Sequence, residues 1–192
     1  MNQVKGENKD QLHIPVMLKE IMTMFAPLGE RAQLRYFDGT FGRGGHLGAL
    51  LKAYPLLSAV AMDRDLEAID YGKTHFAEQI SQERLKLVHG NYTDFSNFDL
   101  GSFDFMLLDL GVSSPQLDQG QRGFSFYHDG PLDMRMNQTE ALTAAEIIQS
   151  YSEDELIQLF MDLGEISRPQ RAVRAIVHDR KEKPFVSTRD LA

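Results

Sequence analysis

A glycine-rich turn followed by an isolated acidic residue is the first pattern in this sequence with the residue types for chemistry. The turn, DGTFGRGGH (residues 38–46), lies between an apolar run and a helical stretch. Glycines let the backbone approach a ligand closely, and the amides that open a helix attract acceptors. Asp63 ends the next apolar run, where a carboxylate can accept hydrogen bonds from both hydroxyls of a ribose. The combination predicts a nucleoside site, and the alternative is a tight turn that binds nothing.

The spacing of these glycines differs from the dinucleotide fingerprint G-x-G-x-x-G. Leu47 occupies the third glycine position counted from Gly42, which disfavours a nicotinamide-dependent oxidoreductase but keeps it as a competing function. Tyr92 follows the third apolar run and either flanks an adenine or is an ordinary tyrosine. His46 either donates to the ligand or only opens the helix. No cluster of metal-ligating residues accompanies His46 and the chain has no cysteine, so no metal site is expected.

A second candidate group, Asp109, ends the fourth apolar run. In the strand order 3-2-1-4, strands one and four are neighbours, and their carboxyl ends bracket the ligand crevice. We therefore expect Asp109 to lie opposite the glycine turn. A carboxylate at that point can bind an ammonium group or accept a hydrogen bond from a substrate amine. The alternative is a helix cap or a loop contact.

Four unbroken apolar runs predict the strands that position these groups. Unbroken rather than alternating runs are typical of parallel strands covered on both faces. Helical spacing is found at residues 15–25 and 46–53 and again after Asp65, so we expect an α/β fold with a Rossmann-like sheet and right-handed crossovers. The four runs are Leu34–Asp38, Leu57–Asp63, Leu85–His89 and residues 103–109.

The chain changes character after the fourth run. Residues 111–137 are rich in Gly, Ser, Pro and Asp and are too long for a routine connection. Capping boxes at Thr143 and Ser152 and a first-turn proline at Pro169 then predict three helices. We expect three parts: a flexible tail at residues 1–11, an α/β domain at 12–116, and a loop with a helical part at 117–192.

The bulk composition narrows the function classes. A net charge of −8 argues against broad, charge-driven binding to naked nucleic acid. No stretch approaches the ~20 apolar residues of a membrane helix, and the N-terminus lacks the apolar core of a signal peptide, so we expect a cytoplasmic protein without membrane contact. Basic residues near the C-terminus form either a local patch or a solvated face of mixed charge. They are Arg168, Arg171, Arg174, Arg180, Lys181, Lys183 and Arg189.

Five segments of the chain resemble the small-subunit ribosomal RNA (cytosine-N4)-methyltransferase H family. The resemblance runs from about residue 12 to the end, and it implies a class I methyltransferase sheet with a helical insertion. It also implies S-adenosylmethionine as cofactor and, as substrate, the N4 amine of a cytidine in 16S ribosomal RNA of the small ribosomal subunit. The segments are HIPVMLKE (13–20), DGTFGRGGH (38–46), AMDRD (61–65), LLDLGVSSPQ (107–116) and RGFSFYHDGPLDMRM (122–136).

Carried over residue by residue, the resemblance implies a set of cofactor contacts. The family's Gly-Glu-Glu near the second inserted helix is Gly164-Glu165-Ile166 here. Family members also continue past Ala192 to further strands, so in the chain as given we expect strand four to be an apolar edge that invites self-association. The implied contacts are Gly44, Gly45, His46, Asp63, Tyr92, Asp109 and Gln116.

The implied reaction adds candidates for catalysis and RNA binding. Asp109 or the backbone of residues 111–115 is expected to accept a hydrogen bond from the cytosine amine, which makes Asp109 the catalytic candidate. The base must leave its stack to reach the site. Phe124 or Phe126 is expected to stack on it, or else both pack the loop against the core, while Arg122 and Arg135 are expected to meet phosphates. The alternative function is an inactive remnant that binds only cofactor or ribosome.

Overall fold

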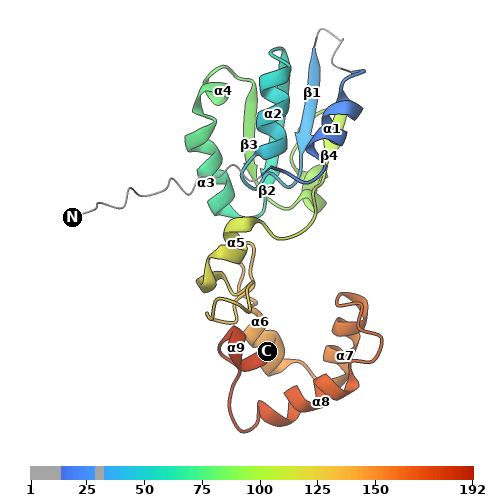
Figure 1. Ribbon diagram of the computed structural model, residues 1–192, viewed down its shortest axis with the longest axis vertical. Coiled ribbons are helices and arrows are strands. Elements are labelled where there is room, and N and C mark those ends of the chain that lie inside the picture. Colours follow the sequence, from blue (N-terminus) through green and yellow to red (C-terminus); the bar gives the residue numbers. More distant parts are fainter. Residues whose placement is uncertain (1–13, 29–32) are drawn as a thin grey trace, which may run out of the picture. The chain divides into compact units, whose positions relative to one another are not determined.

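The computed structural model describes residues 14–28 and 33–192, and these form two compact units (Figure 1). The chain divides between Leu110 and Gly111, a few residues before the boundary at residue 116 that the sequence predicts. The expected tail at residues 1–11 lies outside the described residues. In the described part of the chain, no helix is both long and apolar enough to cross a membrane.

A parallel sheet of four strands, in the order β3-β2-β1-β4, forms the centre of the first unit. The predicted α/β fold and strand order are therefore confirmed. The strand β4 is shorter than its apolar run, because β1 ends at Asp38, whose ladder partner is Leu107, and gives the following residues nothing to pair with. The strands are β1 (Leu34–Asp38), β2 (Leu57–Asp63), β3 (Leu85–His89) and β4 (Phe105–Leu107).

The helices of the first unit follow the predicted pattern with one break. The helix expected after Asp65 is two helices, because Phe76 leaves the helical conformation and its ring packs edge-on against Phe41, with centroids 5.6 Å apart. Asp65 caps the first of them by accepting from the amide of Glu67 at 3.0 Å. The elements are α1 (Leu18–Phe25), α2 (Gly45–Ala53), α3 (Leu66–His75), α4 (Ala77–Ser81) and the 3-10 helix η1 (Tyr92–Asn97).

The two faces of the sheet are covered differently. One face packs against α1, α2 and α3 through residues such as Phe25, Leu50 and Ala68. The other face is covered by η1 and the segment after it, where Phe37 meets Phe95 with ring centroids 4.9 Å apart. Both faces of the strands are apolar for this reason, as unbroken runs predict.

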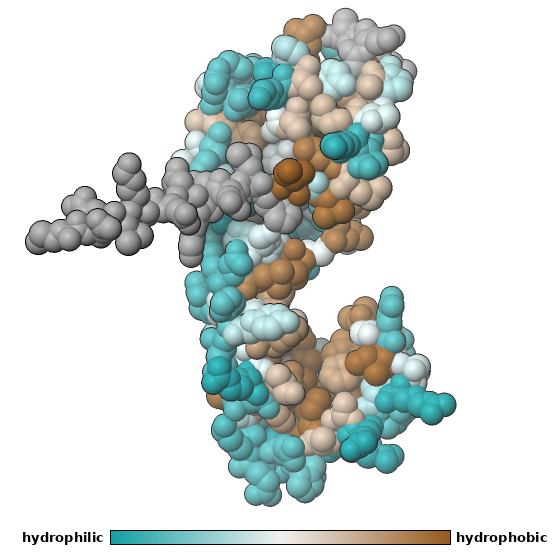
Figure 2. Space-filling model, in the orientation of Figure 1, coloured by the Kyte–Doolittle hydropathy of each residue, from teal (hydrophilic) through white to brown (hydrophobic). Residues whose placement is uncertain are grey.

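At the outer edge of the sheet, β4 and its tip expose apolar side chains. Met106 and Leu108 are 52% and 45% exposed. Within the described residues, β4 pairs with β1 alone. Apolar side chains lie among polar ones on the surface of this unit (Figure 2). Self-association through this edge stays a prediction.

The second unit is a long loop followed by short helices around its own core. Leu132, Ile148, Leu156, Val173 and Ile176 form that core. The predicted capping boxes are both present, at Thr143 with Glu146 and at Ser152 with Glu155. Pro169 directly precedes the helix that it was expected to open. The elements are α5 (Ser114–Asp118), η2 (Gly120–Arg122), α6 (Ala144–Ser150), α7 (Glu153–Asp162), α8 (Gln170–Asp179) and α9 (Thr188–Leu191).

Candidate active site

The glycine turn after β1 is shaped by two glycines with left-handed backbone. Gly42 has φ 53° and Gly44 has φ 69°, a region that favours glycine. A side chain on Gly44 would clash with the rings of Phe41 and Phe76, whereas one on Gly42 would meet nothing closer than 4.0 Å. The turn is therefore packed on one side and open to a ligand above Gly42. It leads into the first turn of α2, whose amides have no partner within the helix.

Asp63, at the end of β2, closes this turn from the neighbouring strand. One carboxylate oxygen accepts from the amide of Gly42 at 2.7 Å, and the other accepts from the amide of Asp65 at 2.8 Å. Burial raises the pKa of Asp63, and these two hydrogen bonds oppose that rise. A carboxylate has about four acceptor positions, so Asp63 can still accept from ligand hydroxyls. The structure thus brings Asp63 next to the glycine turn, as the sequence predicts.

Asp38, at the end of β1, belongs to the same edge of the sheet but is not among the predicted site residues. It is 3% exposed, and its carboxylate accepts from the hydroxyl of Tyr36 at 3.1 Å and from the amide of Thr40 at 3.3 Å. Burial raises the pKa of Asp38 to about 6. The signal that could have found it is its position, since it ends a parallel strand and begins the glycine turn.

Asp109 lies opposite the glycine turn, as predicted. Its amide donates to the hydroxyl of Thr40 at 2.7 Å, and the amide of Gly39 donates to the carbonyl of Leu107 at 3.0 Å. The Asp109 side chain is exposed. Burial and the negative charges of Asp38 and Asp109 together raise the pKa of Tyr36, because an ionised tyrosine would lie close to both. Asp38 and Asp63 thus end β1 and β2, and Asp109 follows two residues after the end of β4, which neighbours β1 in the sheet.

Two further residues that the resemblance implies as cofactor contacts, His46 and Gly45, lie against the segment before α1. His46 is 7% exposed, and its Nε2 lies 3.0 Å from the carbonyl of Val16, so this nitrogen is the donor. A side chain on Gly45 would collide with Pro15. One nitrogen of the His46 ring therefore donates a hydrogen bond within the protein.

Tyr92 opens η1 and is half-buried. It packs against the cluster that includes Phe37 and Val60 on the second face of the sheet. Its expected role beside an adenine stays a prediction.

Gln116 belongs to the second unit, where it is buried in α5. Its side-chain oxygen accepts from the amide of Ser113 at 2.9 Å, which completes a capping box at the start of that helix. The cofactor contact that the resemblance implies for Gln116 stays a prediction.

Arg122 and Arg135 both order the loop before α6. Arg122 is 2% exposed and donates to the carbonyls of Arg135 and Met136 at 3.2 and 3.0 Å. Arg135 forms an ion pair with Asp133 at 2.7 Å, which lowers the pKa of Asp133, and also donates to the carbonyl of Glu140. The expectation that Arg122 meets RNA phosphates finds no support in this geometry, because its guanidinium is buried among backbone carbonyls.

The two predicted stacking residues differ in exposure. Phe124 is half-buried, whereas Phe126 is 72% exposed and lies against Tyr127, with ring centroids 4.6 Å apart. The hydroxyl of Ser125 accepts from the amides of Tyr127 and His128, both at 3.2 Å, and so fixes this turn. Phe126 is therefore the more exposed of the two rings, and stacking of a base on either one stays a prediction.

The basic residues near the C-terminus are largely paired. Arg174 forms an ion pair with Glu153 and Lys183 forms one with Asp190. Arg180 donates to the carbonyls of Ile148 and Tyr151 at 2.7 Å. This pattern fits the solvated face of mixed charge better than a basic patch.

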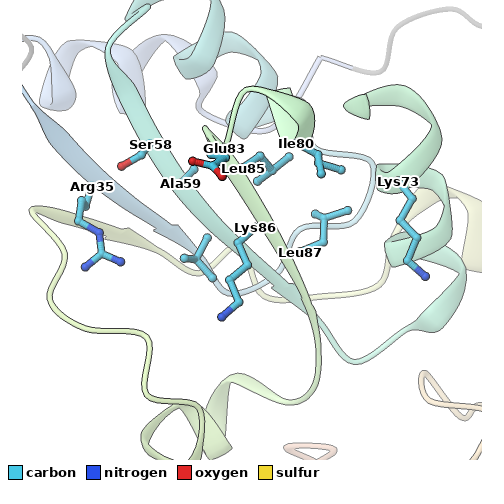
Figure 3. A pocket seen from close by; sticks show the side chains of 10 residues that line it. Arg35, Ser58, Ala59, Lys73, Ile80, Glu83, Leu85, Lys86 and Leu87 are labelled. Atoms are coloured by element: carbon cyan, nitrogen blue, oxygen red, sulfur yellow. The ribbon is translucent and has the colours of Figure 1, made fainter. Parts of the chain in front are cut away.

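A cavity of about 650 Å³ lies elsewhere in the first unit (Figure 3). Its lining includes Arg35, Ser58 and Lys86, which stand near the beginnings of β1, β2 and β3. The three carboxylates lie at or beyond the carboxyl ends of strands, so this cavity is not the site described above. Among the described residues, no group of three or more His, Asp or Glu side chains is arranged to hold a metal ion.

Comparison with known protein families identifies the chain's relatives. The model of the MraW methylase family matches residues 10–192, nearly the whole sequence. The chain belongs to this methylase family. The resemblance found in the sequence is thereby confirmed.

Three curated relatives of this methylase chain carry the name ribosomal RNA small subunit methyltransferase H. The protein of Bdellovibrio bacteriovorus is 57% identical over 180 residues, which cover 94% of this chain and 55% of the relative. The protein of Thermobifida fusca is 41% identical over 184 residues, which cover 94% and 55%. The protein of Crocosphaera subtropica is 40% identical over 187 residues, which cover 96% and 56%. The chain spans about half the length of the curated relatives it matches.

Proposed function

We propose that this chain acts in S-adenosylmethionine-dependent methylation of the N4 amine of a cytidine in 16S ribosomal RNA. One observation carries the proposal: the carboxylate of Asp63 accepts from Gly42 in the open glycine turn, and the backbone of Asp109 is bonded to Thr40 of the same turn. Family membership and the name shared by the relatives support the same reaction.

The charge of the site fits the proposed cofactor. S-adenosylmethionine carries a sulfonium and an ammonium, both positive, and a ribose with two hydroxyls. Asp63 would accept from the ribose hydroxyls, Asp109 would bind the ammonium, and the amides around Gly44 and Gly45 would line the turn. Leu47 stands where the dinucleotide fingerprint has its third glycine, so the nicotinamide alternative suits this turn poorly.

The chain's residues would make the cytosine amine a better nucleophile. When bound, the cofactor supplies an electrophilic methyl group. The amine's lone pair is delocalised into the ring, and an acceptor that takes a hydrogen bond from the amine would localise it. If Asp109 faces the amine instead of the cofactor's ammonium, its carboxylate is that acceptor and then takes the proton. The backbone carbonyls of residues 111–115 are the alternative acceptors. Holding the reacting groups in line at about 3–3.5 Å would supply most of the acceleration.

Phe126 is the proposed stacking partner of the unstacked base. Stacking of a base on an aromatic ring contributes about 1–3 kcal/mol. The exposed ring of Phe126, fixed by the Ser125 turn, meets the requirement for a preformed platform. Arg135 stays a proposed RNA contact, although Asp133 and the carbonyls of Gln138 and Glu140 already bind its guanidinium.

Transfer of a labelled methyl group to small ribosomal subunits that lack the modification tests this proposal. We expect label on N4 of a cytidine in the RNA, and we expect Phe126→Leu to reduce transfer without changing cofactor affinity. Cofactor binding without any transfer would favour the alternative, a chain that binds cofactor or ribosome only. Binding of a nicotinamide dinucleotide in place of S-adenosylmethionine would overturn the proposal.

A further inference from the structure

The tip of β4 is held to the glycine turn by two contacts beyond the sheet. The ladder between β1 and β4 ends at the pair Asp38 and Leu107. After it, the amide of Gly39 donates to the carbonyl of Leu107 at 3.0 Å, and the amide of Asp109 donates to the hydroxyl of Thr40 at 2.7 Å. The Thr40 side chain thus supplies an acceptor that the backbone of β1 no longer offers, because the chain has already turned away.

Thr40 is itself held in place. Its amide donates to the buried carboxylate of Asp38 at 3.3 Å, and Tyr36 donates to the other oxygen of that carboxylate at 3.1 Å. A threonine side chain also has few rotamers, since it is branched at Cβ. The hydroxyl therefore presents a fixed acceptor to the amide of Asp109.

The turn after β1 and the segment after β4 also pack closely against each other. A side chain on Gly39 would lie 2.4 Å from the tip of the Leu108 side chain and 2.9 Å from the ring of Phe37, so a larger residue would force both to shift. Gly39 sets the separation of the two segments, and Thr40 fixes where Asp109 begins. An exposed residue past the end of its strand would otherwise be free to move.

We propose that Thr40 is a positioning residue: its hydroxyl fixes the backbone of Asp109 so that the Asp109 carboxylate points into the site. The inference rests on the proposed function, which gives that carboxylate a ligand to bind. Thr40 acts through Asp109 and needs no contact with the cofactor or the RNA.

A double-mutant cycle on the full chain tests this role by calorimetry with S-adenosylmethionine. Thr40→Val keeps the shape and removes the acceptor, and we expect it to weaken binding about five- to tenfold. Thr40→Ser keeps the acceptor and should stay within about twofold of wild type. In an Asp109→Ala background, Thr40→Val should have no further effect, because the residue that it positions is gone. Thr74→Val, an exposed threonine of α3 that bonds within its own helix, is the matched control.

Each outcome of the cycle bears on one claim. If Asp109→Ala leaves the affinity unchanged, the role that the proposed function gives Asp109 is wrong, and this inference falls with it. If Asp109→Ala weakens binding but Thr40→Val does not, or if the two effects add, only the inference is overturned.

Amide hydrogen exchange gives a second readout that does not require Thr40→Val to fold. In wild type and Thr40→Ser, the amide of Asp109 should exchange at least tenfold more slowly than an unprotected amide. Exchange at the unprotected rate in the wild-type chain would overturn the inference.

Discussion

Burial of the Asp38 carboxylate makes the stability of the protein depend on pH. Its pKa is raised to about 6, mainly by burial, whereas an aspartate in an unfolded chain titrates near ~3.9. Between these values the folded state binds the proton more tightly than the unfolded state. The contribution of Asp38 to the free energy of unfolding therefore falls as the pH rises from about 4 to about 6, and stays low above that.

Asp38→Asn should stabilise the fold at pH 7.5 while leaving the hydrogen bonds possible. The amide oxygen can still accept from Thr40, and the amide NH₂ can donate to the hydroxyl of Tyr36. A shift of about two pKa units corresponds to roughly 3 kcal/mol, which is the upper limit of the gain. Urea unfolding at pH 5 and pH 7.5 measures it, with Asp99→Asn at an exposed position as control. An equal pH dependence in wild type and Asp38→Asn would contradict the assignment.

Sequence reasoning missed the burial of two charged residues, because burial is a property of the tertiary structure. Asp63 and Asp109 are predicted because strand ends and neighbouring strands follow from the apolar runs. Asp38 also ends a strand but is not among the predicted site residues, and Arg122 is predicted to contact RNA, whereas both side chains are buried. Burial of Arg122 depends on the carbonyls of Arg135 and Met136, which only the folded loop brings to it.

At the scale of elements, the bounds that depend on neighbouring residues in the sequence are predicted correctly, whereas the bounds that depend on distant residues are not. The bounds of β1, β2 and β3 and the capping boxes before α6 and α7 follow from neighbouring residues in the sequence. The length of β4 depends on where its partner β1 ends. The break at Phe76 depends on the ring of Phe41, which lies far away in the chain.

The capping box of α7 provides a test at this scale. The Ser152 hydroxyl accepts from the amide of Glu155 at 3.3 Å, and the Glu155 carboxylate accepts from the amide of Ser152 at 2.7 Å. Ser152→Ala should lower the free energy of unfolding by about 1 kcal/mol. Ser150→Ala, whose hydroxyl only bonds back to the Glu146 carbonyl, should change it much less. Equal unfolding midpoints for wild type and Ser152→Ala in urea would show that the box is not formed.

At the scale of the whole molecule, the edge strand β4 is the feature that bears on self-association. Within the described residues β4 pairs with β1 alone, and Met106 in β4 and Leu108 directly after it are exposed. Unpaired backbone groups beside apolar side chains favour pairing with another strand. The chain as given is therefore expected to associate as its concentration rises.

Met106→Lys should reduce that association, because a charge on an edge strand opposes pairing. Sedimentation velocity over a hundredfold range of concentration measures it. Gln82→Lys, which adds the same single positive charge at an exposed position after α4, controls for net charge. A wild-type chain that sediments as a monomer throughout the range would contradict the expectation.

The convergence of the glycine turn with Asp63 and Asp109 on one adenosyl ligand is tested most directly by calorimetry. The titration uses S-adenosylmethionine and protein whose folding is verified by circular dichroism. We expect saturable heat from the wild-type chain and at least tenfold weaker binding by Asp63→Ala, since hydrogen bonds to a charged group contribute roughly 1.5–3 kcal/mol each. Folded wild-type protein that gives no heat, or an Asp63→Ala variant that binds as tightly as wild type, would contradict the account.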